Sequence, residues 1–409
     1  MKVGFAEVDI TPPAGLAIAG SGRRSVGVKA PLLCRAAVFE KAAIVQPDII
    51  GLQEPHVGEA RRLIRAATGL PMSRIMIACP QNHCAPETIA ASGRLEFANR
   101  RHEAWFRRLL RSMAEAAARA LESAAAGRMA CGKSSAKGIG GNRRPVLRSG
   151  KVRTLWYGVE PDEIADEGPE DNDVFVLRFS DDAGRLLGIV FSYTCHPNTT
   201  WATPYFNTDY YGAAIRILKR WYGRSIPFVF LNGACGNIDG YKYLRLPQKA
   251  FLAPGCFERG SGAMRTYAEA DRYGTLLARA VRRCLDSLPE GDEVRRVTVL
   301  RGSVRLKRLK PNVPQAAEVQ VIVLNDTAVV GVPGDYFVEL GLWIKKHSPF
   351  ARTIISAHTN GFLGYLPTRE AYEQGGYEVG CDFTNHAPGC GEAIAEKAVE
   401  LLRKAAGGP

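Results

Sequence analysis

Residues 78–87, ACPQNHCAPE, bring together side chains that are capable of chemistry. His83 stands three residues before Pro86, with the amides of Gln81 and Asn82 on its N-terminal side and an acid just after it. Imidazole serves in proteins as a metal ligand and as an acid–base group. Where a second ligand is expected, however, the chain has Gln81. The segment indicates a metal site or a catalytic site and leaves open whether a metal binds.

Three further polar loops follow apolar, strand-like runs. They are His196-Pro197-Asn198, Gly236-Asn237-Ile238-Asp239 and Pro333-Gly334-Asp335. Loops at strand ends are where polar side chains converge on a substrate. Each has a structural alternative, since a lone His in such a loop is more often a hydrogen-bonded structural residue and Pro-Gly-Asp is a common turn. Their conjunction with residues 78–87 predicts a site.

Strand-like runs alternate with amphipathic helices along the chain, which favours an α/β fold with mixed β-sheets flanked by helices. The predicted strands are 35–40, 75–79, 187–195, 226–235, 319–325 and 353–358. The predicted helices are 57–68 before Gly69, about 102 to Gly127, a helix capped by Asp209 that ends at Gly223, 265–288 and 391–406. These helices are expected to cover the sheets.

The chain has 409 residues, of which 46% are hydrophobic, so it can bury a sizeable core. It contains no internal repeat and no low-complexity linker, and we therefore expect a single domain over residues 1–409. Residues 145–173 are rich in turn formers and acids, which predicts a long surface excursion, either a lid or an ordinary insertion.

The net charge of +13 comes from short basic pairs spread along the chain, such as Arg61-Arg62 and Arg295-Arg296. No nucleic-acid reader motif accompanies it, so we expect a small-molecule substrate and no nucleic-acid partner. No uncharged apolar stretch reaches 18 residues and the first residues lack a secretory pattern, which predicts a cytoplasmic protein without stable membrane association. The ten cysteines are then expected to be reduced.

Motifs in colinear order over essentially the whole chain resemble the neutral/alkaline (non-lysosomal) ceramidase family, in particular its N-terminal catalytic domain and the shorter bacterial relatives. The motifs are VGFAEVDITPPAGLAIAGSGRR, GLPMSRIMIACPQNHCAP, GGNRRP, FSYTCHPNTT, TDYYGAAI, FLNGACGNIDG, GVPGDYFVELG and HTNGFLGYLPTREAYEQGGYE. The resemblance implies a neutral-ceramidase-like fold and a zinc amidohydrolase that cleaves the N-acyl bond of ceramide.

The resemblance also implies the site residues. The metal positions, two His, a Glu and a Tyr in the family, fall on Gln81, His196, Asp335 and Tyr365. The second His of the family's HTH motif falls on His83 and the active-site Arg on Arg143.

Two of these ligand positions depart from the family. Gln81 offers only a neutral amide oxygen, and the side chain of Asp335 is one methylene shorter than that of Glu, whereas catalytic zinc usually has three strong protein ligands. If His83 became a ligand, it would complete a set with His196 and Asp335, but it would then be lost to substrate polarisation or proton transfer.

Asp239 stands where larger family members have a serine, so we predict a catalytic base there in place of a hydroxyl nucleophile. Tyr377 is also predicted to be catalytic, and Gly20, Asn142 and Tyr372 are predicted to bind substrate. A purely structural role is the alternative for Asn142, and aromatic packing is the alternative for the two tyrosines. Cys84, Cys195 and Cys235 lie in site loops as buried thiols or, alternatively, as ligands or nucleophiles.

Two functional hypotheses follow. The first is a hydrolase that cleaves an amide or related acyl bond of a small soluble substrate, with zinc-activated water. The second is a relative without metal that binds or transforms a small molecule, because Gln81 replaces the first zinc histidine.

Overall fold

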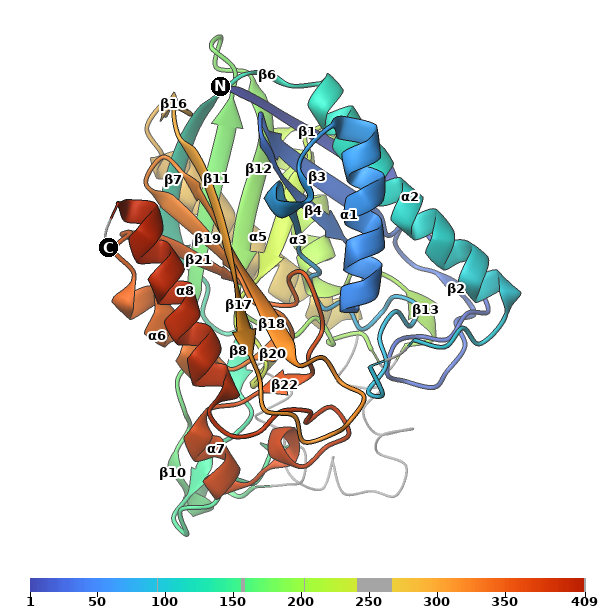
Figure 1. Ribbon diagram of the computed structural model, residues 1–409, viewed down its shortest axis with the longest axis vertical. Helices are drawn as coiled ribbons and strands as arrows, with labels where there is room; N and C mark the ends of the chain where they lie inside the picture. The colour runs from blue at the N-terminus through green and yellow to red at the C-terminus, as the bar shows by residue number, and fades with distance from the viewer. Residues whose placement is uncertain (94, 156–158, 202, 241–266, 408–409) are drawn as a thin grey trace.

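The computed structural model describes residues 1–409 apart from 94, 156–158, 202, 241–266 and 408–409. In this part of the chain, the strands form three larger sheets of five, five and four strands (Figure 1). The first sheet has the order β5-β4-β3-β1-β6, the second β14-β12-β11-β7-β16 and the third β17-β18-β19-β21. The α/β class with mixed sheets is confirmed.

The strand bounds are as follows. The first sheet contains β1 (Lys2–Asp9), β3 (Leu33–Phe39), β4 (Ala42–Pro47), β5 (Ile75–Ile77) and β6 (Ala125–Ala126). The second contains β7 (Arg128–Ser135), β11 (Asp173–Ser180), β12 (Leu186–Tyr193), β14 (Phe228–Asn232) and β16 (Asp292–Glu293). The third contains β17 (Val297–Arg305), β18 (Ala316–Leu324), β19 (Thr327–Gly331) and β21 (Arg352–Ser356).

The three sheets share an apolar core because successive side chains of a strand point to opposite faces. In β3, Ala37 and Phe39 pack in this shared core, whereas Ala36 and Val38 pack in a second core with α1 and α2. The same alternation occurs in the other two sheets, whose outer faces pack against α3 and α5 and against α6 and α8. Each sheet is therefore apolar on both faces.

The α-helices of the described residues are α1 (Glu54–Thr68), α2 (Arg100–Glu122), α3 (Asp209–Tyr222), α5 (Tyr267–Ser287), α6 (Val338–His347), α7 (Arg369–Gln374) and α8 (Cys390–Ala406). Gly69 ends α1 with φ of 74°, as predicted. The prediction that the second helix reaches Gly127 was wrong, because residues 125–126 pair with β1. The cap of α3 is Thr208, and Asp209 is already the first helical residue.

Each large sheet contains one parallel pair of strands, and these pairs position the site. The pairs are β4 with β5, β12 with β14, and β19 with β21. The loops that carry Gln81, His196, Cys235, Asp335 and His358 follow β5, β12, β14, β19 and β21, so they all leave carboxyl ends of paired strands. Parallel strands end at the same edge, which brings these loops together.

Short two-stranded sheets lie outside the three large sheets (Figure 1). They are β8 (Gly140–Asn142) with β15 (Ile238–Gly240), β20 (Asp335–Tyr336) with β22 (Tyr365–Leu366), β2 (Gly27–Val28) with β13 (Tyr205–Phe206), and β9 (Val146–Leu147) with β10 (Ile164–Asp166). The last pair belongs to the predicted excursion at 145–173, which also contacts the α7 region through a hydrogen bond from Val152 N to Gln374 O of 3.0 Å. Within the described residues, every helix is too short or too polar to cross a membrane.

Candidate active site

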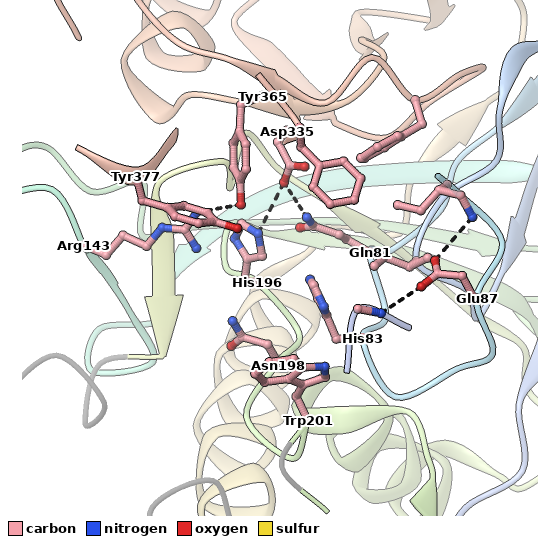
Figure 2. Close-up of a pocket in the computed structure, with 15 residues that line it drawn as sticks. Gln81, His83, Glu87, Arg143, His196, Asn198, Trp201, Asp335, Tyr365 and Tyr377 are labelled. Carbon is pink, nitrogen blue, oxygen red and sulfur yellow. Dashed lines mark hydrogen bonds and ion pairs between the residues drawn. The ribbon is translucent and has the colours of Figure 1, made fainter. Parts of the chain in front are cut away.

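A pocket of about 170 Å³ opens where these loops meet (Figure 2). Its polar lining residues are Gln81, His83, Glu87, Arg143, His196, Asn198 and Asp335. Its apolar and aromatic lining residues are Ile50, Ile89, Trp201, Phe362, Tyr365, Tyr377 and Phe383, and Gly20 completes the wall. Such a combination of apolar walls and a few convergent polar groups is typical of a small-molecule site.

Asp335 lies at the polar end of the pocket with an exposed fraction of 3%. It is in register with Tyr365 in the parallel pair of β20 and β22, which explains why residues 30 positions apart meet. Gly334, with φ of 98°, permits this pairing, since a Cβ atom there would lie 2.5 Å from Gly364 O.

Gln81 and Asp335 are in direct contact. The Gln81 side-chain Nε2 donates a short hydrogen bond to Asp335 Oδ1, and Gln81 Oε1 accepts one from the Cys235 thiol at 3.2 Å. Gln81 has a positive φ of 65°, an uncommon conformation for a residue other than Gly. The amide of Gln81 is therefore fixed at both ends.

His196 approaches the same carboxylate oxygen. Its Nδ1–H donates to Ile238 O at 3.1 Å, which directs Nε2 toward Asp335 Oδ1 at 3.3 Å. Burial disfavours the imidazolium, but the neighbouring Cys235 thiol and Asp335 carboxylate outweigh burial and raise the pKa of His196 to about 10.

His358, to which sequence reasoning assigned no role, is a second imidazole at this centre. Its Nε2 lies 3.5 Å from Asp335 Oδ1, and its exposed fraction is 1%. Burial opposes its protonation, yet the charge of Asp335 raises the pKa of His358 to about 9. The two imidazoles in turn hold the pKa of Asp335 well below its usual range, against the effect of burial. The available signal was its position at the carboxyl end of the predicted strand 353–358.

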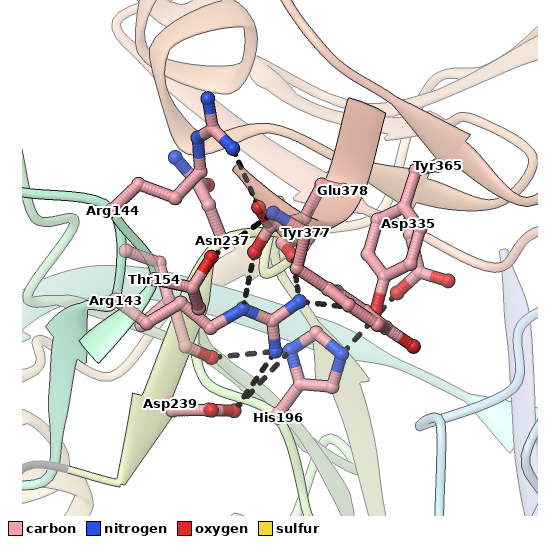
Figure 3. Close-up of polar contacts among 12 residues, drawn as sticks. Arg143, Arg144, Thr154, His196, Asn237, Asp239, Asp335, Tyr365, Tyr377 and Glu378 are labelled. Carbon is pink, nitrogen blue, oxygen red and sulfur yellow. Dashed lines mark hydrogen bonds and ion pairs between the residues drawn. The ribbon is translucent and has the colours of Figure 1, made fainter. Parts of the chain in front are cut away.

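Arg143 joins the pocket to a buried ion-pair network (Figure 3). Its guanidinium contacts Glu378 Oε1 at 2.7 Å and Asp239 Oδ1 at 3.2 Å, and it donates to Gly236 O at 2.8 Å. A further hydrogen bond of 3.0 Å runs from Arg143 Nη2 to Tyr365 Oη. Arg143 is thus held rigidly, with Tyr365 as its contact at the pocket wall.

Of the other predicted site residues, some line the pocket and some do not. His83, Gly20 and Tyr377 line the pocket, whereas Asn142, Tyr372 and Asp239 are not among its lining residues. Asn142 Nδ2 donates to Pro169 O at 3.1 Å and Tyr372 Oη to His386 O at 2.6 Å, so both make structural contacts.

Asp239 and the three cysteines of the site loops lie at different places relative to the pocket. Asp239 is fully buried and accepts from Asn198 Nδ2 at 2.9 Å besides pairing with Arg143, and it does not line the pocket. Cys235 touches Gln81, while Cys84 lies 3.2 Å from Thr200 Oγ1, away from Asp335. Cys195 is buried, and its Sγ donates to His196 O at 3.6 Å.

Several lining residues were given no site role from the sequence. They are Glu87, Asn198, Trp201, Phe362, Phe383, Ile50 and Ile89. Glu87 lies away from Arg143 in Figure 2 and accepts a hydrogen bond from Gly20 N at 2.9 Å. Glu87 is the last residue of the segment ACPQNHCAPE, so its carboxyl group was a visible signal. The apolar lining residues have no such signal, because an apolar residue in a pocket wall looks the same in sequence as one in the core.

Comparisons with known proteins agree on the fold. Neither a family model nor a curated protein matches the sequence. Among solved structures, the chain is similar to the neutral ceramidase from Pseudomonas aeruginosa, with a TM-score of 0.78 and 16% identity over 100% of this chain and 75% of that one. It is equally similar to a structure described as a ceramidase complexed with C2, with a TM-score of 0.78, 16% identity and 76% of that chain covered. The protein therefore has a neutral-ceramidase-like fold, as the motifs predicted.

The zinc site that this resemblance implies is not assembled by the carried-over residues. Gln81 turns its NH₂ group, which has no lone pair for a metal, toward Asp335. Tyr365 Oη already accepts a hydrogen bond from Arg143. Among the described residues, no group of three or more His, Cys, Asp or Glu side chains is arranged to hold a metal ion. The donor set does not fit zinc, and we assign no catalytic step to a metal.

Proposed function

We propose that this protein is a hydrolase that cleaves an amide or related acyl bond of a small molecule in the pocket beside Asp335. The observation that carries the proposal is the presence of an acid–base imidazole, His83, and a hydrogen-bond-donating hydroxyl, Tyr365, in the wall of one partly apolar pocket. The neutral-ceramidase-like fold supports the same class of reaction.

The pocket walls favour an acyl compound of modest size. Ile50, Ile89 and Phe362 give an apolar surface for the acyl chain, whereas Asn198 and His83 supply hydrogen bonds to the polar part. A volume of about 170 Å³ suits a small substrate better than a lipid with two long chains.

Tyr365 is suited to stabilise the oxyanion. Because Arg143 donates to its oxygen at 3.0 Å, the hydroxyl proton is left to point elsewhere, and Tyr365 is one of the residues that line the pocket. Burial raises the pKa of Tyr365 well above its usual value, so the hydroxyl stays protonated at neutral pH. A fixed donor of this kind lowers the barrier because it needs no reorganisation as charge develops.

The reaction then proceeds with His83 as the acid–base group. A water oxygen attacks the carbonyl carbon while the imidazole takes the proton from that water, and the resulting oxyanion accepts a hydrogen bond from Tyr365. When the tetrahedral intermediate collapses, the C–N bond breaks and the imidazole returns the proton to the leaving nitrogen. The products are a carboxylic acid and an amine.

The experiment is a product assay with a panel of N-acyl amides and esters of increasing acyl length. Mass spectrometry should detect an equal amount of amine or alcohol and acid, and the His83→Asn variant should lose about 10²-fold or more of the rate. Absence of hydrolysis across the panel, or a His83→Asn variant as fast as the parent, would reject the proposed chemistry.

A further inference from the structure

The side chain of Gln81 lies against Asp335, at a position where the motif resemblance implies a histidine. We infer that the Asp335 centre is closed by hydrogen bonds from Gln81 and holds no metal, and that position 81 decides this, so that Gln81→His creates a zinc site. The inference concerns the centre of the proposed hydrolase, but it is tested by metal content and does not require that the substrate be known.

The orientation of the Gln81 amide is determined by its two partners. A carboxylate only accepts hydrogen bonds, so the NH₂ group must face Asp335, and the carbonyl oxygen then faces the Cys235 sulfur at 3.2 Å. A flipped amide would place two acceptor oxygens against each other. The only metal-binding atom of the amide is therefore turned away from the carboxylate.

The charge of Asp335 is already balanced without a cation. The Nε2 atoms of His196 and His358 lie 3.3 Å and 3.5 Å from the same Oδ1 atom. The three nitrogens of Gln81, His196 and His358 thus surround one carboxylate oxygen, whereas a metal site requires its donors to surround a common empty point. This explains why the described residues contain no metal-binding group although two imidazoles and a carboxylate are in contact.

The backbone at position 81 suits histidine. Its φ of 65° lies in the left-handed region, where His, Asn and Asp are several-fold enriched over other non-glycine residues. A histidine at position 81 can adopt the same backbone conformation as Gln81. The substitution would also remove the NH₂ group that contacts Asp335. The new imidazole, His196 and Asp335 would then give two nitrogens and one carboxylate, a ligand set of catalytic zinc sites.

The test measures zinc by mass spectrometry in protein grown with added zinc and then dialysed. The parent chain and Gln81→Leu should each contain less than about 0.1 zinc per chain, whereas Gln81→His should contain about one. The double variant Gln81→His/Asp335→Asn should return to the parent value, because the carboxylate ligand is lost. Zinc should also raise the melting temperature of Gln81→His alone.

Two results would overturn the inference. One is a parent chain with about one zinc that Asp335→Asn removes. The other is a Gln81→His variant that has the parent's circular dichroism spectrum and binds no zinc. If Gln81→His does not fold, the zinc contents of the parent and Asp335→Asn still test the claim that the Asp335 centre of the parent holds no metal. Failure of the panel assay in turn would leave these zinc measurements unaffected, so the two proposals fail separately.

Discussion

His358 Nε2 lies 3.5 Å from Asp335 Oδ1 in the interior of the protein, although 23 positions separate the two residues. The contact arises because β19 and β21 run parallel and both end at this edge of the third sheet. Asp335 therefore has imidazole partners from two sheets, His196 from the second and His358 from the third. The carboxylate is held by the fold itself.

The partnership of His358 predicts a pH-dependent contribution to stability. Its folded-state pKa of about 9 lies above the ordinary value of 6.5, so the protonated imidazole is favoured by folding. The stabilisation is complete below about pH 6.5 and is lost as the pH rises through about 9. Urea unfolding of the parent and His358→Asn should thus show a difference in unfolding free energy that shrinks over this range. A difference that stays constant with pH would mean that the pair is not ionic.

Glu378 is predicted to be a major determinant of stability. It is fully buried and contacts Arg143 at 2.7 Å and Arg144 at 2.6 Å. Glu378→Gln should lower the unfolding free energy by about 3–5 kcal/mol, because it leaves buried positive charge without its partner. Glu163→Gln is the matched control, since that residue pairs with Arg153 at the surface at 3.2 Å, where solvent screens the pair, and it should change stability far less. Equal effects in urea titrations would contradict this account of the network.

Tyr365 and Tyr372 provide a second matched pair, for activity. Removal of the hydroxyl in Tyr365→Phe should lower kcat by about 10²-fold or more, as loss of an oxyanion donor does. Tyr372→Phe removes a hydroxyl that bonds His386 O at 2.6 Å outside the pocket, so its kcat should match that of the parent. Steady-state kinetics on the best panel substrate distinguish the two. A Tyr365→Phe variant with unchanged kcat would remove Tyr365 from the reaction.

Much of the fold was predictable because it depends on local patterns. Strands such as 187–195 and helices such as 57–68 have apolar periodicity and clear stops, and the structure contains β12 and α1 at these places. The end of α2 was misplaced because residues 125–126 pair with β1, and a non-local pairing has no local signal.

The site was predictable where a motif marks it and unpredictable where topology alone creates it. Gln81, His83, Arg143, His196 and Tyr365 carry motifs and all line one pocket with Asp335. His358 carries none, and it reaches Asp335 only because two strands are parallel neighbours. Asn142 and Tyr372 also stand within motifs, but their side chains bond to the backbone and neither lines the pocket.

The most direct test of the account is the hydrolysis rate of protein treated with a chelator and shown to be free of metal. With the best N-acyl amide of the panel, the treated parent chain should keep its full rate, and His83→Asn should lose about 10²-fold or more while retaining its folded spectrum. A treated parent chain that is inactive until zinc is added back, or a His83→Asn variant as fast as the parent, would contradict a metal-free hydrolase centre in this pocket.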